Sequence, residues 1–245
     1  MKKIFYLVTL VAISLLFVQC EQNGKQNELG KSSGKHNGHE YVDLGLPSGL
    51  KWATCNIGAS KPKEYGDYFA WGETKPKSYY DWSTYKYATT DGQLTKYCTD
   101  SKYIDYGVID NKTILDPEDD AAHVNWGGEW RMPTYEEIDE LINECEWSWY
   151  NPATIYDATG FVVTGPNGNT MFLPATGCMI QDSLDRIDDH CASYWSSSLY
   201  YFDPYNGDPT RAMYLYCFSK HVGRSEQKFL SLDRPVGMAI RPVCM

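Results

Sequence analysis

The segment WRMPTYEEIDELINEC, residues 130–145, carries the clearest structural signal in the chain. Thr134 follows Pro133 and stands three residues before Glu137, which is the spacing of a capping box at the start of a helix. Apolar residues then recur with helical spacing, at Ile138, Leu141, Ile142 and Cys145. This pattern predicts an amphipathic helix that begins at Thr134 and packs one apolar face on a sheet.

Short apolar or β-branched runs on both sides of the helix predict strands. Before the helix, 41–46 and 50–53 flank Pro47-Ser48-Gly49, whose residues are typical of a turn. Between and beyond these runs, residues 61–112 are rich in Tyr, Lys, Asp and Gly without a clear period. We therefore expect long loops there, held by aromatic side chains such as Trp71 and Trp82.

After the helix, the runs 161–164 and 170–173 flank Pro166-Asn167-Gly168. Asn-Gly favours a tight turn, so these two runs predict a hairpin. The last strands are expected at 192–198, 212–218 and 237–243. One helix among short strands predicts the α+β class, with mostly antiparallel strands and long loops. Because no second linker or repeat interrupts the chain, we expect one domain over 39–245.

The composition excludes several classes of protein. The chain has 245 residues, of which 42% are hydrophobic and 22% charged, so it is neither a disordered chain nor a multi-span membrane protein. A net charge of -10 argues against non-specific binding to nucleic acid, which requires clustered Lys and Arg. The 20 Tyr and 8 Trp residues exceed what a core of this size needs and indicate a recognition surface.

The N-terminus predicts export. Lys2 and Lys3 precede an apolar run over 4–18, which is typical of a signal peptide spanning 1–19. The run ends at Cys20 in a segment that resembles a bacterial lipoprotein cleavage box, although Gln19 replaces the small residue of that pattern. We expect Cys20 to be lipidated; the alternative is plain secretion with an incidental thiol. Residues 20–38 are polar and flexible in composition and predict a tether.

Seven cysteines remain after Cys20, and an oxidising setting allows up to three disulfides with one thiol left over. No spacing among them is that of a zinc site, so we expect a structural role and no metal. The seven are Cys55, Cys98, Cys145, Cys178, Cys191, Cys217 and Cys244.

Five motifs, in order, carry a resemblance to a known family: YVDLGLPSGLKWA (41–53), YFAWGE (68–73), WGGEWRMPT (126–134), YWSSS (194–198) and GMAIRPV (237–243). They resemble the Fibrobacter succinogenes major paralogous domain, a family of Bacteroides-type surface lipoproteins. The resemblance implies a C-type-lectin-like fold, similar to that of formylglycine-generating enzymes, and an outer-membrane location facing outside.

The residues of these motifs also have a structural interpretation. Trp126, Trp130 and Trp195 supply large rings for a core bordered by long loops. Arg131 and Arg241 are expected to hold loop carboxylates through bidentate pairs. We therefore interpret these residues as the frame of the domain.

The cluster Asp116, Glu118, Asp119 and Asp120 with His123 has two interpretations. Its oxygens suit calcium, but the spacing is not that of an EF-hand loop. Asp116 followed by Pro117 also fits the start of a short helix through Val124, with acidic residues in its first turn. We favour the helix start. The sugar-coordinating tripeptides of calcium-dependent C-type lectins are absent from the sequence, so calcium-dependent sugar binding is not implied.

Enzymatic signals are weak, and we expect no catalytic residue and no cofactor. Ser196, Ser197 and Ser198 lack the Gly-x-Ser-x-Gly context of a nucleophile elbow. Formylglycine-generating enzymes bind copper through a closely spaced cysteine pair, whereas Cys217 and Cys244 are far apart in sequence. An enzyme of that type and a structural envelope protein are the alternatives to a binding protein.

The segment LYYFDPYNGDPTR, 199–211, is too polar for a core and too aromatic for a simple connection. We predict a ligand-binding surface here, continued by alternate residues of the following strand, that recognises a glycan or a protein. The alternative is a loop whose rings fold back onto the domain. The predicted binding residues are Tyr200, Tyr201, Asp203, Tyr205, Asn206, Asp208, Tyr214, Tyr216, His221 and Arg224.

This region also resembles the variable proteins of diversity-generating retroelements, which carry the same fold and randomise adenine-containing codons near the C-terminus. Randomised AAC or AAT codons cannot encode Lys, Glu, Gln, Met or Trp. None of these residues occurs over 196–211. The resemblance predicts a diversified binding surface.

Overall fold

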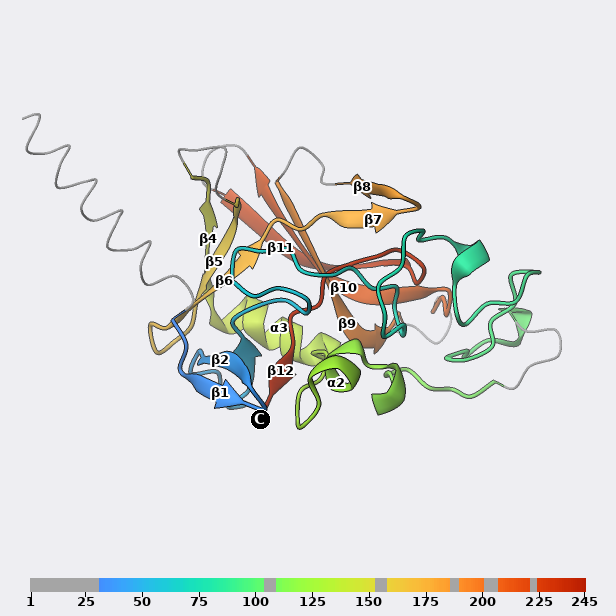
Figure 1. Ribbon diagram of the computed structural model, residues 1–245, viewed down its shortest axis with the longest axis horizontal. Coiled ribbons are helices and arrows are strands. Elements are labelled where there is room, and N and C mark those ends of the chain that lie inside the picture. Colours follow the sequence, from blue (N-terminus) through green and yellow to red (C-terminus); the bar gives the residue numbers. More distant parts are fainter. Residues whose placement is uncertain (1–30, 104–108, 153–157, 186–189, 201–206, 221–223) are drawn as a thin grey trace, which may run out of the picture.

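A computed structural model gives the architecture of the chain (Figure 1). Within the residues it describes, the protein is α+β, with mostly antiparallel strands in small sheets around helix α3, as the sequence predicts. Side chains are described for these residues except over 220–229, where the backbone alone is described. The described residues are 31–103, 109–152, 158–185, 190–200, 207–220 and 224–245.

Helix α3, Tyr135–Glu144, begins where its capping box predicts. Thr134 Oγ1 accepts a hydrogen bond from the Glu137 N–H at 3.4 Å, and Glu137 Oε2 accepts one from the Thr134 N–H at 2.8 Å. The pair satisfies two N–H groups that a helix start otherwise leaves without partners. Ile138 and Leu141 are buried and form the apolar face that the sequence pattern predicts.

The central sheet has the order β11-β10-β9 and is antiparallel. Its strands are β9, Cys191–Leu199, β10, Arg211–Lys220, and β11, Arg224–Asp233. Every residue of β9 is buried, because the sheet is covered on both faces. Since side chains alternate along a strand, Tyr194 and Trp195 enter two different cores.

The first core, named here the helix-side core, lies between β9–β10 and helix α3 (Figure 1). It is completed by the sheet β4-β5-β6, formed by β4, Glu146–Tyr150, β5, Gly160–Thr164, and β6, Thr170–Pro174. The β5–β6 hairpin is confirmed, and Gly168 adopts φ +84° in its turn. Buried members of this core include Val42, Trp52, Ile138, Leu141, Phe161, Leu173, Tyr194 and Cys217.

The N-terminal sheet has the order β1-β2-β3-β12. Strands β2, His39–Asp43, and β3, Lys51–Ala53, confirm the two strands predicted around Pro47, although β2 begins earlier than expected. Strand β1, Gly34–His36, pairs with β2 through a two-residue turn. Strand β12, Val243–Cys244, pairs with β3 and brings the last residues beside the first strands.

Strand β1 corrects the predicted tether over 20–38, because its last residues belong to the domain. The turn residues Asn37 and Gly38 both have positive φ, 44° and 87°. An Asn-Gly pair is the preferred sequence for such a hairpin turn. The polar composition of the segment masked this signal. Cys20 and the predicted signal peptide lie outside the described residues.

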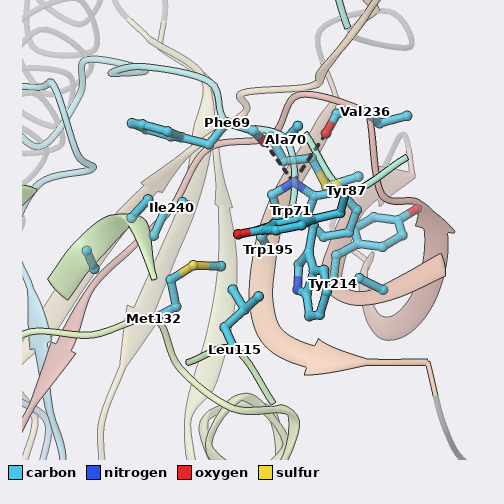
Figure 2. Close-up of a cluster of buried hydrophobic side chains, with 14 of the residues drawn as sticks. Phe69, Ala70, Trp71, Tyr87, Leu115, Met132, Trp195, Tyr214, Val236 and Ile240 are labelled. Carbon is cyan, nitrogen blue, oxygen red and sulfur yellow. Dashed lines mark hydrogen bonds between the residues drawn. The ribbon is translucent and has the colours of Figure 1, made fainter. Parts of the chain in front are cut away.

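The second core, named here the loop-side core, covers the opposite face of β9–β10 and is built largely from irregular chain. The Trp195 indole N–H reaches two backbone carbonyls, those of Phe69 at 2.9 Å and Val236 at 3.3 Å (Figure 2). The Trp71 indole N–H donates to the Ser196 carbonyl at 2.9 Å. Long loops held by aromatic residues are thus confirmed. Other buried members include Tyr85, Tyr87, Tyr97, Tyr214 and Met238.

Short elements border the loop-side core. The 3-10 turns η1, Trp82–Thr84, and η2, Ser101–Tyr103, lie within the predicted loop region. The hairpin of β7, Cys178–Ile180, and β8, Ser183–Asp185, brings Cys178 and Met179 against this core. The sequence did not predict this hairpin, nor strands β4 and β11.

The predicted strand 237–243 is wrong over most of its length. Gly237 pairs with Met179, Met238 with Phe69, and Ala239 with Tyr194, each as an isolated bridge. This segment crosses between sheets, so successive residues find different partners. Only its last residue joins β12.

The helix predicted from Asp116 is divided in two. Pro117 begins the 3-10 turn η3, Pro117–Asp119, as expected, but the Asp116 side chain makes no capping bond. Asp120 instead caps α2, Ala121–Trp126, by accepting from the N–H groups of Ala122 and His123. The acidic cluster therefore contains a helix start at Asp120.

The two arginines expected to hold loop carboxylates differ. Arg131 makes a bidentate pair, but its partner Glu137 lies in the first turn of α3 and not in a loop. Arg241 is buried and donates to Asn56 Oδ1 and to the carbonyls of Ala53 and Thr54, so it binds neutral acceptors. This corrects the prediction for Arg241, because burial favours backbone acceptors that the bend after β3 leaves available.

The seven cysteines after Cys20 carry free thiols in the structure, so the expected disulfides are not formed among these described residues. Cys98, Cys191, Cys217 and Cys244 are buried and pack as small apolar side chains. Burial raises the pKa of the Cys217 thiol. Among the described residues, no helix has the length and apolar character needed to span a membrane.

Candidate functional site

The predicted ligand-binding surface is only partly described by the structure. Tyr200 is half-buried where β9 ends, and Asp208 lies just before β10 begins. The Arg224 backbone starts β11, but its side chain is outside the description. The predicted residues Tyr201, Asp203, Tyr205, Asn206 and His221 lie outside the described residues.

Residues 200 and 207–211 form what we call the neck, the two chain segments that join 201–206 to the central sheet. The Tyr200 N–H donates to the Arg211 carbonyl at 3.1 Å and joins the two segments directly. The Arg211 N–H donates to the Asp208 carbonyl at 3.1 Å. Asp208 Oδ1 also accepts from the N–H and the hydroxyl of Thr210, at 2.9 and 2.6 Å. The predicted binding residue Asp208 therefore uses one carboxylate oxygen to shape the neck.

Arg234, which follows β11, ties the neck to the loop-side core. Its side chain is fully buried. The guanidinium donates to the Pro209 carbonyl at 2.9 Å, to the Tyr97 carbonyl at 3.2 Å and to the Lys96 carbonyl at 3.0 Å. The Arg234 N–H adds a bond to the Thr210 carbonyl at 3.0 Å. One side chain thus connects the neck with a loop more than a hundred residues earlier in the sequence.

Aromatic rings surround the same guanidinium. Its central carbon lies 5.0 Å from the Trp71 ring centroid and 5.2 Å from that of Tyr85. The Tyr85 hydroxyl accepts from Arg234 Nε at 2.8 Å and donates to the Trp71 carbonyl at 2.7 Å. Burial raises the pKa of Tyr85, so the phenol stays neutral. The buried cation is balanced by carbonyl dipoles and ring faces.

The remaining predicted residues lie on β10 and differ in exposure. Tyr214 is 6% exposed and packs against Trp195 in the loop-side core, so its assignment to the binding surface is wrong. The sheet face that was expected to carry ligand contacts is covered there by the loops. Tyr216 is half-buried at the border of the same core and stacks with Phe218 at 6.3 Å between ring centroids. Burial raises the pKa of Tyr216 to about 12.

The acidic cluster has a lysine at its centre. Lys96 Nζ lies 2.6 Å from Asp119 Oδ2, 2.7 Å from Asp116 Oδ2 and 3.5 Å from Glu118 Oε1. These three acidic groups are close enough together to hold a metal ion, but their carboxylates already pair with the ammonium groups of Lys96, Lys86 and Lys112. The cluster is an ion-pair network that ties the loop containing Lys96 to the turn before α2.

Asp119 is the buried member of this network. The Tyr97 hydroxyl donates to Asp119 Oδ2 at 2.7 Å, and Lys86 Nζ lies 3.0 Å from Oδ1. Burial alone raises the pKa of this carboxyl, but the hydrogen bonds from Lys96, Tyr87 and Tyr97 hold the pKa well below its ordinary value. Asp119 therefore remains ionised. It fixes Lys96 and Tyr97, whose carbonyls accept hydrogen bonds from Arg234.

Sequence reasoning missed Arg234 and Lys96, which organise this region. The partners of Arg234 lie at 85, 96, 97 and 209, so no local pattern points to them. Its one sequence signal is a charged residue between β11 and the apolar segment 236–240. Comparison with known proteins adds no relative: no family model, curated protein or solved structure matches this chain.

Proposed function

We propose that this chain is an exported, lipid-anchored binding module that recognises a glycan or a protein through the Tyr-rich segment 199–211. The observation that carries this proposal is the anchored neck. Tyr200, Arg211 and Arg234 connect both ends of the segment to the central sheet and the loop-side core. A short aromatic segment that starts and ends on fixed residues is suited to present side chains to a partner.

The composition of the segment supports recognition. Tyrosine offers a large ring and a hydroxyl with few rotatable bonds, so ordering it on binding costs little entropy. Asp203, Asn206 and Gly207 add hydrogen-bonding groups and backbone freedom. Tyr216 is half-buried on β10 and stays a predicted contact residue, but the buried Tyr214 lies between it and the neck.

A C-type-lectin-like fold of the Fibrobacter succinogenes major paralogous domain type is part of this proposal. It rests on the five sequence motifs, and several of their large residues belong to the buried frame. Trp52, Trp71, Trp130 and Trp195 are each 1% exposed or less. Their burial supports the interpretation of the motifs as the frame of the proposed fold.

Binding can be tested with a soluble version of the chain that starts at Glu21, screened against host and microbial glycans and proteins. For a ligand found this way, Tyr200→Ala and Tyr205→Ala should each weaken binding about tenfold or more, because aromatic contacts dominate such surfaces. Tyr79→Ala is the matched control, since Tyr79 is 38% exposed on another loop. Equal affinity of the wild type and both segment variants would remove the proposed site.

Export and anchoring have a separate test. When the full chain is expressed in cells, the protein should carry a lipid on Cys20, which mass spectrometry of the N-terminal peptide detects. The protein should also be accessible to protease on intact cells. Cys20→Ser should release the protein from the membrane fraction. A wild-type protein that stays inside the cell, or that carries no lipid on Cys20, would contradict export and anchoring.

Diversification of the segment is testable in the genome. A diversity-generating retroelement requires a reverse-transcriptase gene nearby and a near-copy of the sequence that encodes 196–243. If neither is present beside the gene, the diversified surface is ruled out, and a binding surface of fixed sequence remains.

A further inference from the structure

A small pocket lies far along the chain from the Tyr-rich segment, between the β1–β2 hairpin, the bend after β3 and the end of α2. Its volume is about 310 Å³, at the lower end of the range for small-molecule sites. The hairpin contributes Lys35, His39 and Glu40, the bend contributes Cys55, and α2 contributes Trp126. Three separate segments therefore build its wall.

The aromatic part of the wall is held in place before any ligand arrives. The His39 imidazole stacks on the Trp126 indole, with 3.8 Å between ring centroids and an angle of 4° between the planes. Trp130 packs edge-on against Trp126 at 5.1 Å and donates its indole N–H to the His36 carbonyl at 2.9 Å. Asn37 Nδ2 donates to the Trp126 carbonyl. These contacts fix the hairpin against the tryptophans and preorganise the pocket.

Two oppositely charged side chains of the wall form an ion pair. Lys35 Nζ lies 3.4 Å from Glu40 Oε1, and both side chains are well exposed, at 65% and 47%. This single contact uses one donor of the ammonium and one acceptor of the carboxylate, which leaves further donors and acceptors for a ligand. The two charges cancel, so the pocket favours neither anions nor cations.

We infer that this pocket binds one neutral saccharide ring, a monosaccharide or a single residue of a glycan. A hydroxyl group both donates and accepts, so adjacent hydroxyls can bridge Lys35 and Glu40 without separating them. The C–H face of a sugar ring suits the aromatic wall, whereas a purely apolar ligand would bury the ion pair without compensation. A zwitterion would compete for the same donors of Lys35 and acceptors of Glu40, so glycine serves as the competing ligand in the test. The site is separate from the Tyr-rich segment and does not depend on it.

Cys55 provides a local reporter of occupancy. Its half-buried thiol lines the pocket, and iodoacetamide alkylates it by forming an S–C bond with loss of iodide and a proton. Burial raises the pKa of the Cys55 thiol, so the labelling is run in mildly alkaline buffer. Peptide mass spectrometry follows Cys55 together with Cys145 and Cys178, which are also half-buried but lie elsewhere.

The experiment labels the full chain in the presence of glucose, galactose, mannose, N-acetylglucosamine or glycine at rising millimolar concentration. At least one sugar should slow alkylation of Cys55 in a saturable way and leave Cys145 and Cys178 unchanged. Glu40→Gln should weaken this protection about tenfold, which is the expected loss for one hydrogen bond to a charged group. Lys102→Met, which removes an exposed ion pair with Asp100, should leave the protection unchanged.

Three results would overturn the inference. The first is that no sugar slows the alkylation of Cys55. The second is that the sugars slow the alkylation of all three cysteines equally, which would be a solvent effect. The third is that glycine alone protects Cys55, which would assign the pocket to zwitterions. Alkylation of Cys55 reports only on this pocket. A failure of the binding test with Tyr200→Ala and Tyr205→Ala would therefore not change the result of the labelling experiment.

Discussion

The two faces of the β9–β10 pair are buried to the same degree but by different means. Tyr194, on the helix side, is 2% exposed, and Trp195, on the loop side, is fully buried. The helix-side core is covered by α3 and by regular strands whose backbone groups pair with one another. The loop-side core is covered by irregular chain, so side chains such as Arg234 and Trp195 must satisfy its carbonyls.

The two halves of the fold differ in the interactions that specify their structure. On the helix side, apolar volume and one capping box are sufficient, and conservative apolar changes should be tolerated. On the loop side, a substitution that keeps the volume but removes a donor leaves several buried carbonyls without partners. The neck of the Tyr-rich segment belongs to this second kind of structure.

The largest expected effect is that of Arg234→Met, which keeps the length of the side chain and removes all its donors. The carbonyls of Pro209, Tyr97 and Lys96 lose their hydrogen bonds, so the free energy of unfolding should fall by about 4 kcal/mol. Urea unfolding measures the change. Arg131→Met, which breaks the partly exposed pair with Glu137, should cost about 1 kcal/mol. If Arg131→Met lowered the free energy of unfolding more than Arg234→Met does, the loop-side core would not depend on Arg234 as described.

Neighbouring residues on β9 test the two faces directly. Trp195→Phe removes ring volume and an indole N–H that serves Phe69 and Val236, and should cost about 3 kcal/mol. Tyr194→Phe removes only the hydroxyl that donates to the Pro174 carbonyl at 2.8 Å, and should cost about 1 kcal/mol. Thermal and urea unfolding of both variants give the values. Equal costs would mean that the two cores do not differ as described.

The capping box offers a smaller test on the helix side. Thr134→Ala removes the acceptor for the Glu137 N–H and should lower the free energy of unfolding by about 1 kcal/mol. Thr134→Ser keeps that acceptor and should stay close to the wild type. If the alanine and serine variants unfold at the same urea concentration, the cap does not stabilise α3.

The smallest expected effect is a pH dependence at His39. Burial lowers the pKa of His39 from its ordinary value of 6.5, so the unfolded chain binds the proton more readily than the folded one. The stability that His39 contributes is present above pH about 6.5 and is lost as the pH falls towards its folded pKa. The urea midpoint is measured at about pH 7.5 and about pH 5.5, on either side of the ordinary pKa of histidine. The difference between the two midpoints should be smaller in His39→Phe than in the wild type. An unchanged difference would remove His39 as the cause.

The regular half of the fold is the half that the sequence predicts well. The capping box at Thr134, the apolar period of α3 and the β5–β6 hairpin are local patterns, and local patterns are visible in a sequence. Strands β9 and β10 are also confirmed. The hairpin turn Asn37–Gly38 was visible too, but the polar composition around it favoured a tether.

The irregular half could not be predicted in the same way. Arg234 joins residues 96, 97 and 209, and Lys96 meets Asp119, so their roles exist only after the chain has folded. Tyr214 illustrates the same limit, because alternation along β10 gives its face but not the loops that cover that face. The pocket beside Trp126 likewise arises from three distant segments.

Hydrogen–deuterium exchange measures whether the neck that joins 201–206 to the central sheet is fixed. The amides of Tyr200, Arg211 and Arg234 donate to carbonyls within the neck and should exchange as slowly as that of Leu141 in α3. In Arg234→Met the neck amides should exchange faster while Leu141 stays protected. Neck amides that exchange in the wild type as fast as exposed turn residues such as Asp91 would show that the neck is not fixed.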